Sequence, residues 1–115
     1  MSIEQTSTID FISVEPGTDL IVLTVSDHLE WPNDASDHLV LMQEKLNSYL
    51  RFIESGEVLE SHPKAQGKKP LIDVVLKFRP SEQGIDFFRK AQAIVEDSGI
   101  QFQYRVLEDM ERPKE

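Results

Sequence analysis

The chain of 115 residues contains no cysteine, which excludes disulfide bonds, thiolate metal ligands and a cysteine nucleophile. No apolar run approaches the roughly 18 residues that a membrane-spanning helix requires. The five glycines are scattered and form no phosphate-binding loop. The first residues lack the basic and apolar regions of a signal peptide. We therefore expect a cytoplasmic protein that has no membrane association and no cofactor.

Positive charge is scarce in the first half of a chain whose net charge is −9. Residues 1–60 hold twelve Asp and Glu against Lys45 and Arg51, a net charge of −10, whereas residues 61–115 hold nine against ten, a net charge of +1. Because no single element carries a basic cluster, the sequence predicts no nucleic-acid binding. An acidic half can attract a basic protein partner, and the alternative is that the acidity only keeps the protein soluble.

Hydrophobic periodicity predicts six elements in the order β-β-α-β-α-β. Residues 8–14, 20–25, 71–78 and 100–106 read as strands, and residues 36–55 and 82–98 read as helices, with a polar loop over 57–69. We expect Asp34 or Ser36 to cap the first helix and Ser81 to cap the second. Right-handed crossovers then place both helices on one face of a four-stranded sheet. The predicted fold is α+β, a two-layer α/β sandwich.

The length predicts a single domain over residues 1–115, with an ordered core over about 8–107 and a charged tail over 108–115. The sheet face turned away from the helices would carry Leu20, Val22, Leu71 and Val75 among polar residues. This face is more apolar than a solvent-exposed surface usually is, so we predict that a homodimer or another partner covers it. Scattered surface hydrophobics are the alternative explanation.

The tetrapeptide Ser-Asp-His-Leu occurs twice, at residues 26–29 and 36–39. Two of the three histidines, several carboxylates and the only tryptophan fall within these fourteen residues. Trp31 is either an exposed interface anchor or a buried staple whose N–H bonds to a loop carbonyl. The candidate interaction residues of this region are Asp27, His28, Glu30, Trp31, Asp34, Asp37, His38 and Glu44.

The same region carries a resemblance to a known family. Asp27-His28-Leu29 with Trp31, followed by the run His-Leu-Val-Leu-Met-Gln-Glu-Lys-Leu-Asn-Ser-Tyr-Leu-Arg-Phe-Ile-Glu-Ser-Gly-Glu over residues 38–57, resembles a family of small bacterial proteins known only as a domain of unknown function. The similarity continues through residues 67–69, 74–77 and the second helix, and covers roughly residues 8–106. The resemblance implies a bacterial, single-domain, cytoplasmic protein and implies no activity, cofactor or catalytic residue.

Three functions remain open. The first is a non-enzymatic interaction module, of which an immunity-like protein is one form, whose acidic edge binds a basic protein partner. The second is a small enzyme or divalent-metal protein centred on the two tetrapeptides, with His28, His38 and Asp37 as ligands. No pair of these residues has a known metal-binding spacing, and Ser26 and Ser36 lie in no nucleophile motif, so we identify no catalytic residue. The third is a structural homodimer in which the tetrapeptides only cap a helix and fix a loop.

Overall fold

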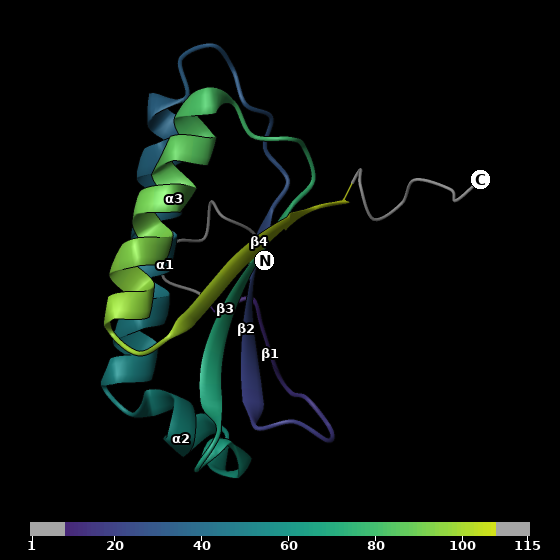
Figure 1. Ribbon diagram of the computed structural model, residues 1–115, viewed down its shortest axis with the longest axis vertical. Helices are drawn as coiled ribbons and strands as arrows, with labels where there is room; N and C mark the ends of the chain where they lie inside the picture. Colours follow the sequence, from purple (N-terminus) through teal and green to yellow (C-terminus); the bar gives the residue numbers. More distant parts are fainter. Residues whose placement is uncertain (1–8, 108–115) are drawn as a thin grey trace, which may run out of the picture.

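A computed structural model describes residues 9–107 of the chain (Figure 1). A four-stranded mixed sheet is covered on one side by helices α1 and α3, which lie side by side. Strand β1 spans Phe11–Val14, β2 Leu20–Asp27, β3 Lys69–Leu76 and β4 Gln101–Val106; helix α1 spans Ser36–Glu54, α2 Glu57–Ser61 and α3 Glu82–Asp97. The α+β class and the four strands are confirmed.

The strands stand in the sheet in the same order as in the chain, β1-β2-β3-β4. β1 pairs antiparallel with β2 through a tight hairpin, whereas β2, β3 and β4 run parallel to one another. Each parallel connection therefore passes through a helix, α1 in the first case and α3 in the second. The register places Leu23 opposite Ile72 and Ile72 opposite Phe102, so one row of alternating side chains faces the helices.

The hydrophobic core lies between this face of the sheet and the two long helices. The alternating residues of the strands and the apolar stripes of α1 and α3 meet there, as their spacing predicts. The most deeply buried members are Leu23, Val25, Met42, Tyr49, Ile72, Val74, Leu76 and Phe88. Ser81 caps α3 as expected, since its hydroxyl oxygen accepts a hydrogen bond from the Gly84 N–H at 3.3 Å.

The predicted loop over residues 57–69 was wrong, because the structure places α2 and a 3-10 turn (Pro63–Ala65) within it. Gly56 has a φ of 85°, a left-handed conformation that glycine adopts easily and that turns the chain from α1 into α2. Val58 and Ala65 are buried against the core, which is why a largely polar segment is held in order. The predicted tail over 108–115 and residue 8 lie outside the described residues.

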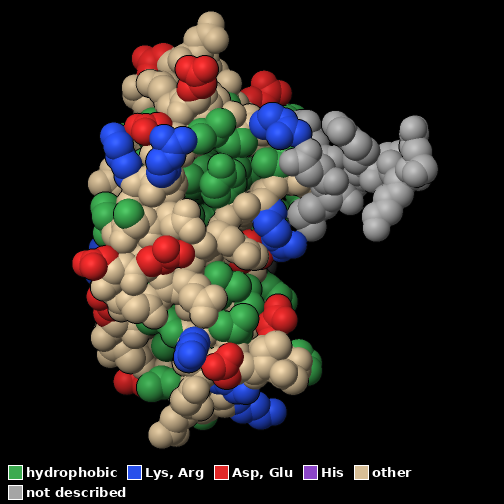
Figure 2. Space-filling view, in the orientation of Figure 1, with side chains coloured by type: hydrophobic (Ala, Val, Ile, Leu, Met, Phe, Trp, Pro, Cys, Tyr) green, Lys and Arg blue, Asp and Glu red, His purple; other side chains and the backbone are tan. Residues whose placement is uncertain are grey.

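The outer face of the sheet combines apolar and charged residues. Leu71 and Val75 are half-buried, and Phe11 on the edge strand is 61% exposed. Between them Asp73, 4% exposed, accepts hydrogen bonds from the Arg105 guanidinium at 2.7 and 3.2 Å. Figure 2 views the sheet from its β4 edge and not onto this outer face; it shows hydrophobic side chains gathered between α3 and β4, with lysine and arginine side chains beside them.

Candidate functional site

The two Ser-Asp-His-Leu segments face each other across the connection between β2 and α1. The first copy ends β2 and the second begins α1. Asp27 of the first copy and His38 of the second are both buried, and their Oδ2 and Nε2 atoms lie 2.5 Å apart. His28 and Asp37, the equivalent residues of the opposite copies, are exposed. The repeat therefore supplies one buried Asp–His pair, made from one half of each copy.

His38 uses both ring nitrogens within the protein. Its Nδ1 lies 3.0 Å from the carbonyl oxygen of Glu30, while its Nε2 faces the carboxylate of Asp27. Both partners are acceptors, and only the doubly protonated imidazolium can donate to both. The second carboxylate oxygen of Asp27 accepts the Leu29 N–H at 3.0 Å. The pair thus fixes the first residues after β2 to the first turn of α1.

Trp31 covers this pair from the solvent side. Its ring stacks on the His38 ring with centroids 3.7 Å apart and meets Phe88 of α3 edge-on at 6.0 Å. A Cβ added at Gly84 would lie 2.7 Å from the Trp31 ring, so α3 approaches the indole this closely only with glycine there. Trp31 is therefore half-buried between α1 and α3 and holds the β2–α1 connection against both helices. The expected bond from its N–H to a loop carbonyl was wrong, since Nε1 is buried with no partner within residues 9–107.

A second buried polar cluster ties α1 to the hairpin, and the sequence analysis missed it. Lys45 is fully buried and its Nζ lies 2.7 Å from Asp10 Oδ1. The other oxygen of Asp10 accepts the Ser26 N–H at 3.0 Å. The Tyr49 hydroxyl accepts the Asp10 N–H at 2.8 Å and donates to the Thr24 carbonyl. We call Asp10, Lys45 and Tyr49 the Lys45 cluster, and Asp27, His38 and Trp31 the His38 cluster.

A signal for the Lys45 cluster was present in the sequence. Lys45 lies three residues after Met42 and four before Tyr49, which puts it on the core side of α1. Asp10 precedes Ile12 and Val14 at alternate positions and therefore points to the same face of the sheet. A lysine and an aspartate that each fall on a buried face predict a pair. Burial of the Tyr49 hydroxyl raises its pKa well above the ordinary value.

The family of the chain is established by a sequence comparison. The model of a family of unknown function, DUF6572, matches residues 1–108. The chain belongs to this family. The match confirms the resemblance seen in the sequence and extends beyond both ends of the predicted range of residues 8–106. The comparisons found no match among curated proteins and none among solved structures.

The remaining candidate residues of this DUF6572 protein lie on the surface. Glu30, Asp34, Asp37 and Glu44 are exposed along the β2–α1 connection and the outer side of α1, and we call these four the acidic edge. In Figure 2 acidic side chains gather at the end of the molecule where Figure 1 shows this connection. Val40, 52% exposed, lies between Asp37 and Glu44 at helical spacing. The edge therefore surrounds an apolar contact point with negative charge.

Asp34 organises the start of α1 without serving as its cap. Its Oδ1 accepts the Ser36 hydroxyl at 2.5 Å and the Ser36 N–H at 3.1 Å, and these bonds lower the pKa of Asp34. The expected side-chain N-cap was wrong, because Ala35 occupies that position. The Ala35 N–H instead donates to Gln83 Oε1 of α3 at 2.9 Å. The exposed carboxylate of Asp34 thus stays charged into acid solution.

The metal site considered from the sequence can be compared with the positions of its three candidate ligands. No group of three or more His, Asp or Glu side chains that could hold a metal occurs within residues 9–107. Both nitrogens of His38 are occupied, so this residue cannot also bind a metal beside His28 and Asp37 without losing a partner.

No helix in the described part of the chain has the length and apolar character needed to cross a membrane.

Proposed function

We propose that the protein is a non-enzymatic interaction module whose acidic edge binds a basic protein partner. The observation that carries this proposal is the distribution of charge over residues 27–50. Lys45 is the only lysine or arginine of this segment, and it is fully buried beside Asp10. The exposed surface of this segment therefore carries Glu30, Asp34 and Asp37. No lysine or arginine of the same segment is exposed beside them. Such a surface attracts a positively charged partner and accelerates its association.

The two buried clusters support the proposal in a different way. They fix the β2–α1 connection at Asp27 and Glu30 and fix α1 at His38, Lys45 and Tyr49. A preordered surface loses less conformational entropy when it binds than a flexible loop does. Asp27 and His38 act in this proposal through the positions they give to the acidic edge, since both are buried. An immunity-like role, in which the edge covers a basic site on a toxin, is one form of the proposal.

The test is capture of proteins from the native lysate by three tagged variants at low and high salt. The wild type is expected to retain a basic protein that high salt releases. The double variant Asp34→Lys/Asp37→Lys is expected to lose that protein. The control Glu60→Lys/Glu96→Lys changes the net charge equally at exposed positions of α2 and α3 and is expected to retain it. Equal retention by both double variants would contradict the proposal, provided that thermal unfolding shows both to be folded.

A further inference from the structure

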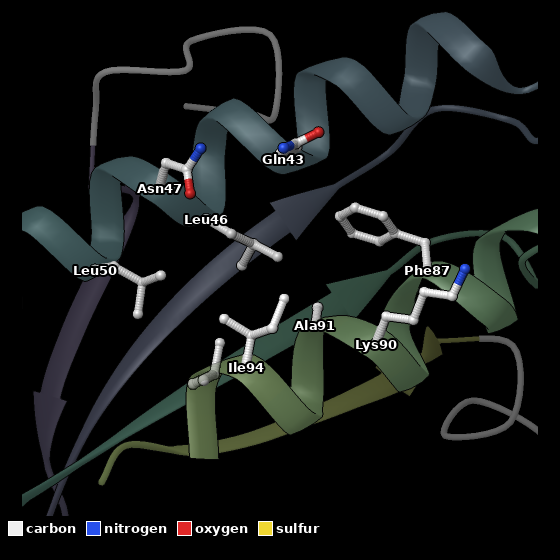
Figure 3. Close-up of a pocket in the computed structure, with 9 residues that line it drawn as sticks. Gln43, Leu46, Asn47, Leu50, Phe87, Lys90, Ala91 and Ile94 are labelled. Atoms are coloured by element: carbon white, nitrogen blue, oxygen red, sulfur yellow. The ribbon is translucent and has the colours of Figure 1, made fainter. Parts of the chain in front are cut away.

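An open apolar groove lies between α1 and α3 on the helical side of the molecule. Its volume is about 260 Å³, and Figure 3 shows side chains of both helices converging on it. Leu46 and Leu50 of α1 and Phe87, Ala91 and Ile94 of α3 supply the apolar walls. Ile94 is 65% exposed, more than any other large hydrophobic residue within 9–107. A protruding apolar side chain therefore stands beside an open apolar groove on the same surface.

From this arrangement we propose that two copies of the chain associate through their helical layers, with Ile94 of each copy entering the groove of the other. A two-fold symmetric interface needs a surface that is complementary to itself. The exposed Ile94 beside the groove meets that requirement, because a two-fold rotation can place the Ile94 side chain of each copy over the groove of the other. The proposal is independent of the function proposed above.

The charge of the surface favours a second copy of the chain as the occupant. Each chain carries a net charge of −9, so two copies repel unless they meet through a nearly neutral surface. Lys90 is the only charged residue among the described residues that line the groove, and it is paired with Asp86 at 3.1 Å. Gln43 and Asn47 complete the rim with neutral hydrogen-bonding groups.

The acidic edge does not obstruct this contact. Asp37 and Glu44 do not line the groove, and the helical period places them on the solvent side of α1, next to the side that lines the groove and farther from α3. A dimer centred on the groove and α3 therefore leaves both acidic edges open to solvent. Two open edges on one particle would strengthen binding to a partner that is itself repeated.

The area available sets the strength of the dimer. Helix α1 has 19 residues and is therefore about 28 Å long, and two adjacent helices are about 20 Å wide. The whole outer surface of the two helices therefore offers roughly 500–600 Å² per copy, and a contact that leaves the acidic edge open buries less than about 1,100 Å² in total, below the range of standard stable interfaces. We therefore expect a dimer that dissociates in the micromolar range.

The outer face of the sheet is the competing surface for a dimer. Its centre holds the Asp73–Arg105 pair, and Arg105 has a side chain 43% exposed whose remaining hydration a partner would remove. Removing water from an ion pair costs free energy that the apolar neighbours Leu71 and Val75 must offset. The groove between α1 and α3 imposes no comparable cost, since its charged group lies at the rim.

Sedimentation velocity over a range of protein concentrations tests the proposal with two matched variants. Ile94→Glu is expected to stay monomeric at concentrations where the wild type is mostly dimeric. Phe11→Glu places the same charge on the outer face of the sheet at a similarly exposed position and is expected to dimerise like the wild type. Both residues are exposed, so both variants should fold, and thermal unfolding checks this. A monomeric wild type at millimolar concentration, or loss of the dimer in Phe11→Glu alone, would overturn the proposal.

The absence of cysteine allows a direct measurement of the geometry. A nitroxide attached to Asn47→Cys at the groove rim is expected to give a shorter label-to-label distance in the dimer than one attached to Ser13→Cys on the outer face. The reverse order of the two distances would place the interface on the sheet and refute the helical contact.

Discussion

The His38 cluster and the Lys45 cluster join the same two layers, yet they use different chemistry. Each connects a residue of the β1–β2 hairpin to a side chain of α1. One cluster joins a carboxylate to the ammonium group of a lysine, which only donates hydrogen bonds, whereas the other joins a carboxylate to the imidazole of a histidine, which has two distinct ring nitrogens. The comparison shows how one helix is fixed at two points, with a lysine pair at its centre and a histidine pair at its start.

The clusters also differ in how they are enclosed. Lys45 is fully buried within the core and lies near the Tyr49 ring, 5.9 Å from its centroid. The Asp27–His38 pair is buried to the same extent, but the half-buried Trp31 stacks on its imidazole and forms part of its cover. A charged group that has no access to water costs more to leave unpaired than one that water can reach. We therefore expect the two clusters to respond unequally when they are broken.

The largest effect is expected when Lys45 is replaced by methionine. The variant leaves the carboxylate of Asp10 buried without its cation, which should lower the free energy of unfolding by about 3–5 kcal/mol. Urea unfolding measures the loss, and Lys64→Met at an exposed position is the control. The double variant Asp10→Asn/Lys45→Met should regain part of the stability. A loss below about 1 kcal/mol would mean that the pair behaves like a surface ion pair.

A smaller effect is expected when Asp27 is replaced by alanine. The change removes the partner of His38 and the acceptor of the Leu29 N–H, which should cost about 3 kcal/mol. Asp37→Ala alters the matching residue of the other tetrapeptide and should cost less than about 1 kcal/mol, because Asp37 is exposed in the first turn of α1. Chemical unfolding of the two variants checks the difference. Equal losses would show that the repeat is used symmetrically.

Gly84→Ala tests the enclosure of the His38 cluster by Trp31. Helix propensity alone would make the alanine variant more stable by about 1 kcal/mol. The added Cβ, however, would lie 2.7 Å from the indole and 2.9 Å from Pro80, and overpacking of this kind costs about 1–3 kcal/mol. The same change in a Trp31→Phe background should cost less, because the smaller ring leaves room. Thermal unfolding of the four proteins completes the cycle. A stabilised Gly84→Ala protein would show that the indole moves aside freely.

The strands, the two long helices and the core could be predicted because their signals are periodic. Ile72, Val74 and Leu76 alternate along β3, and the apolar stripe of α1 repeats at the period of a helix. The α2 segment was missed because five residues are too few to show a period. Its position depends on the burial of Val58, which is a tertiary contact that the local sequence does not reveal.

The candidate site was predicted as a segment but not as a geometry. The repeat identified Asp27 and His38, yet both copies are identical in sequence, so nothing local indicates which histidine is buried. That choice follows from the end of β2 and the start of α1 facing each other. Lys45 was overlooked because a lysine on a helix is usually exposed, and only its position between Met42 and Tyr49 indicates otherwise. The interaction role of the acidic edge stays a prediction.

The mildest way to separate the two clusters is to replace Tyr49 by phenylalanine and vary the pH. At neutral pH the variant loses the hydrogen bonds to Thr24 and Asp10, which should cost about 1–2 kcal/mol. Burial raises the pKa of Tyr49 in the folded protein, so the unfolded chain loses this proton first as the pH rises. The stability that Tyr49 contributes is therefore present below a pH of about 10 and is lost above it. The difference in unfolding free energy between the wild type and Tyr49→Phe should therefore narrow in alkaline solution.

Thermal unfolding from neutral to alkaline pH measures this difference in stability. The control Tyr104→Phe, at an exposed position, should show no comparable narrowing. A constant gap would mean that the hydroxyl reaches water, and the Lys45 cluster would then be no better enclosed than the His38 cluster.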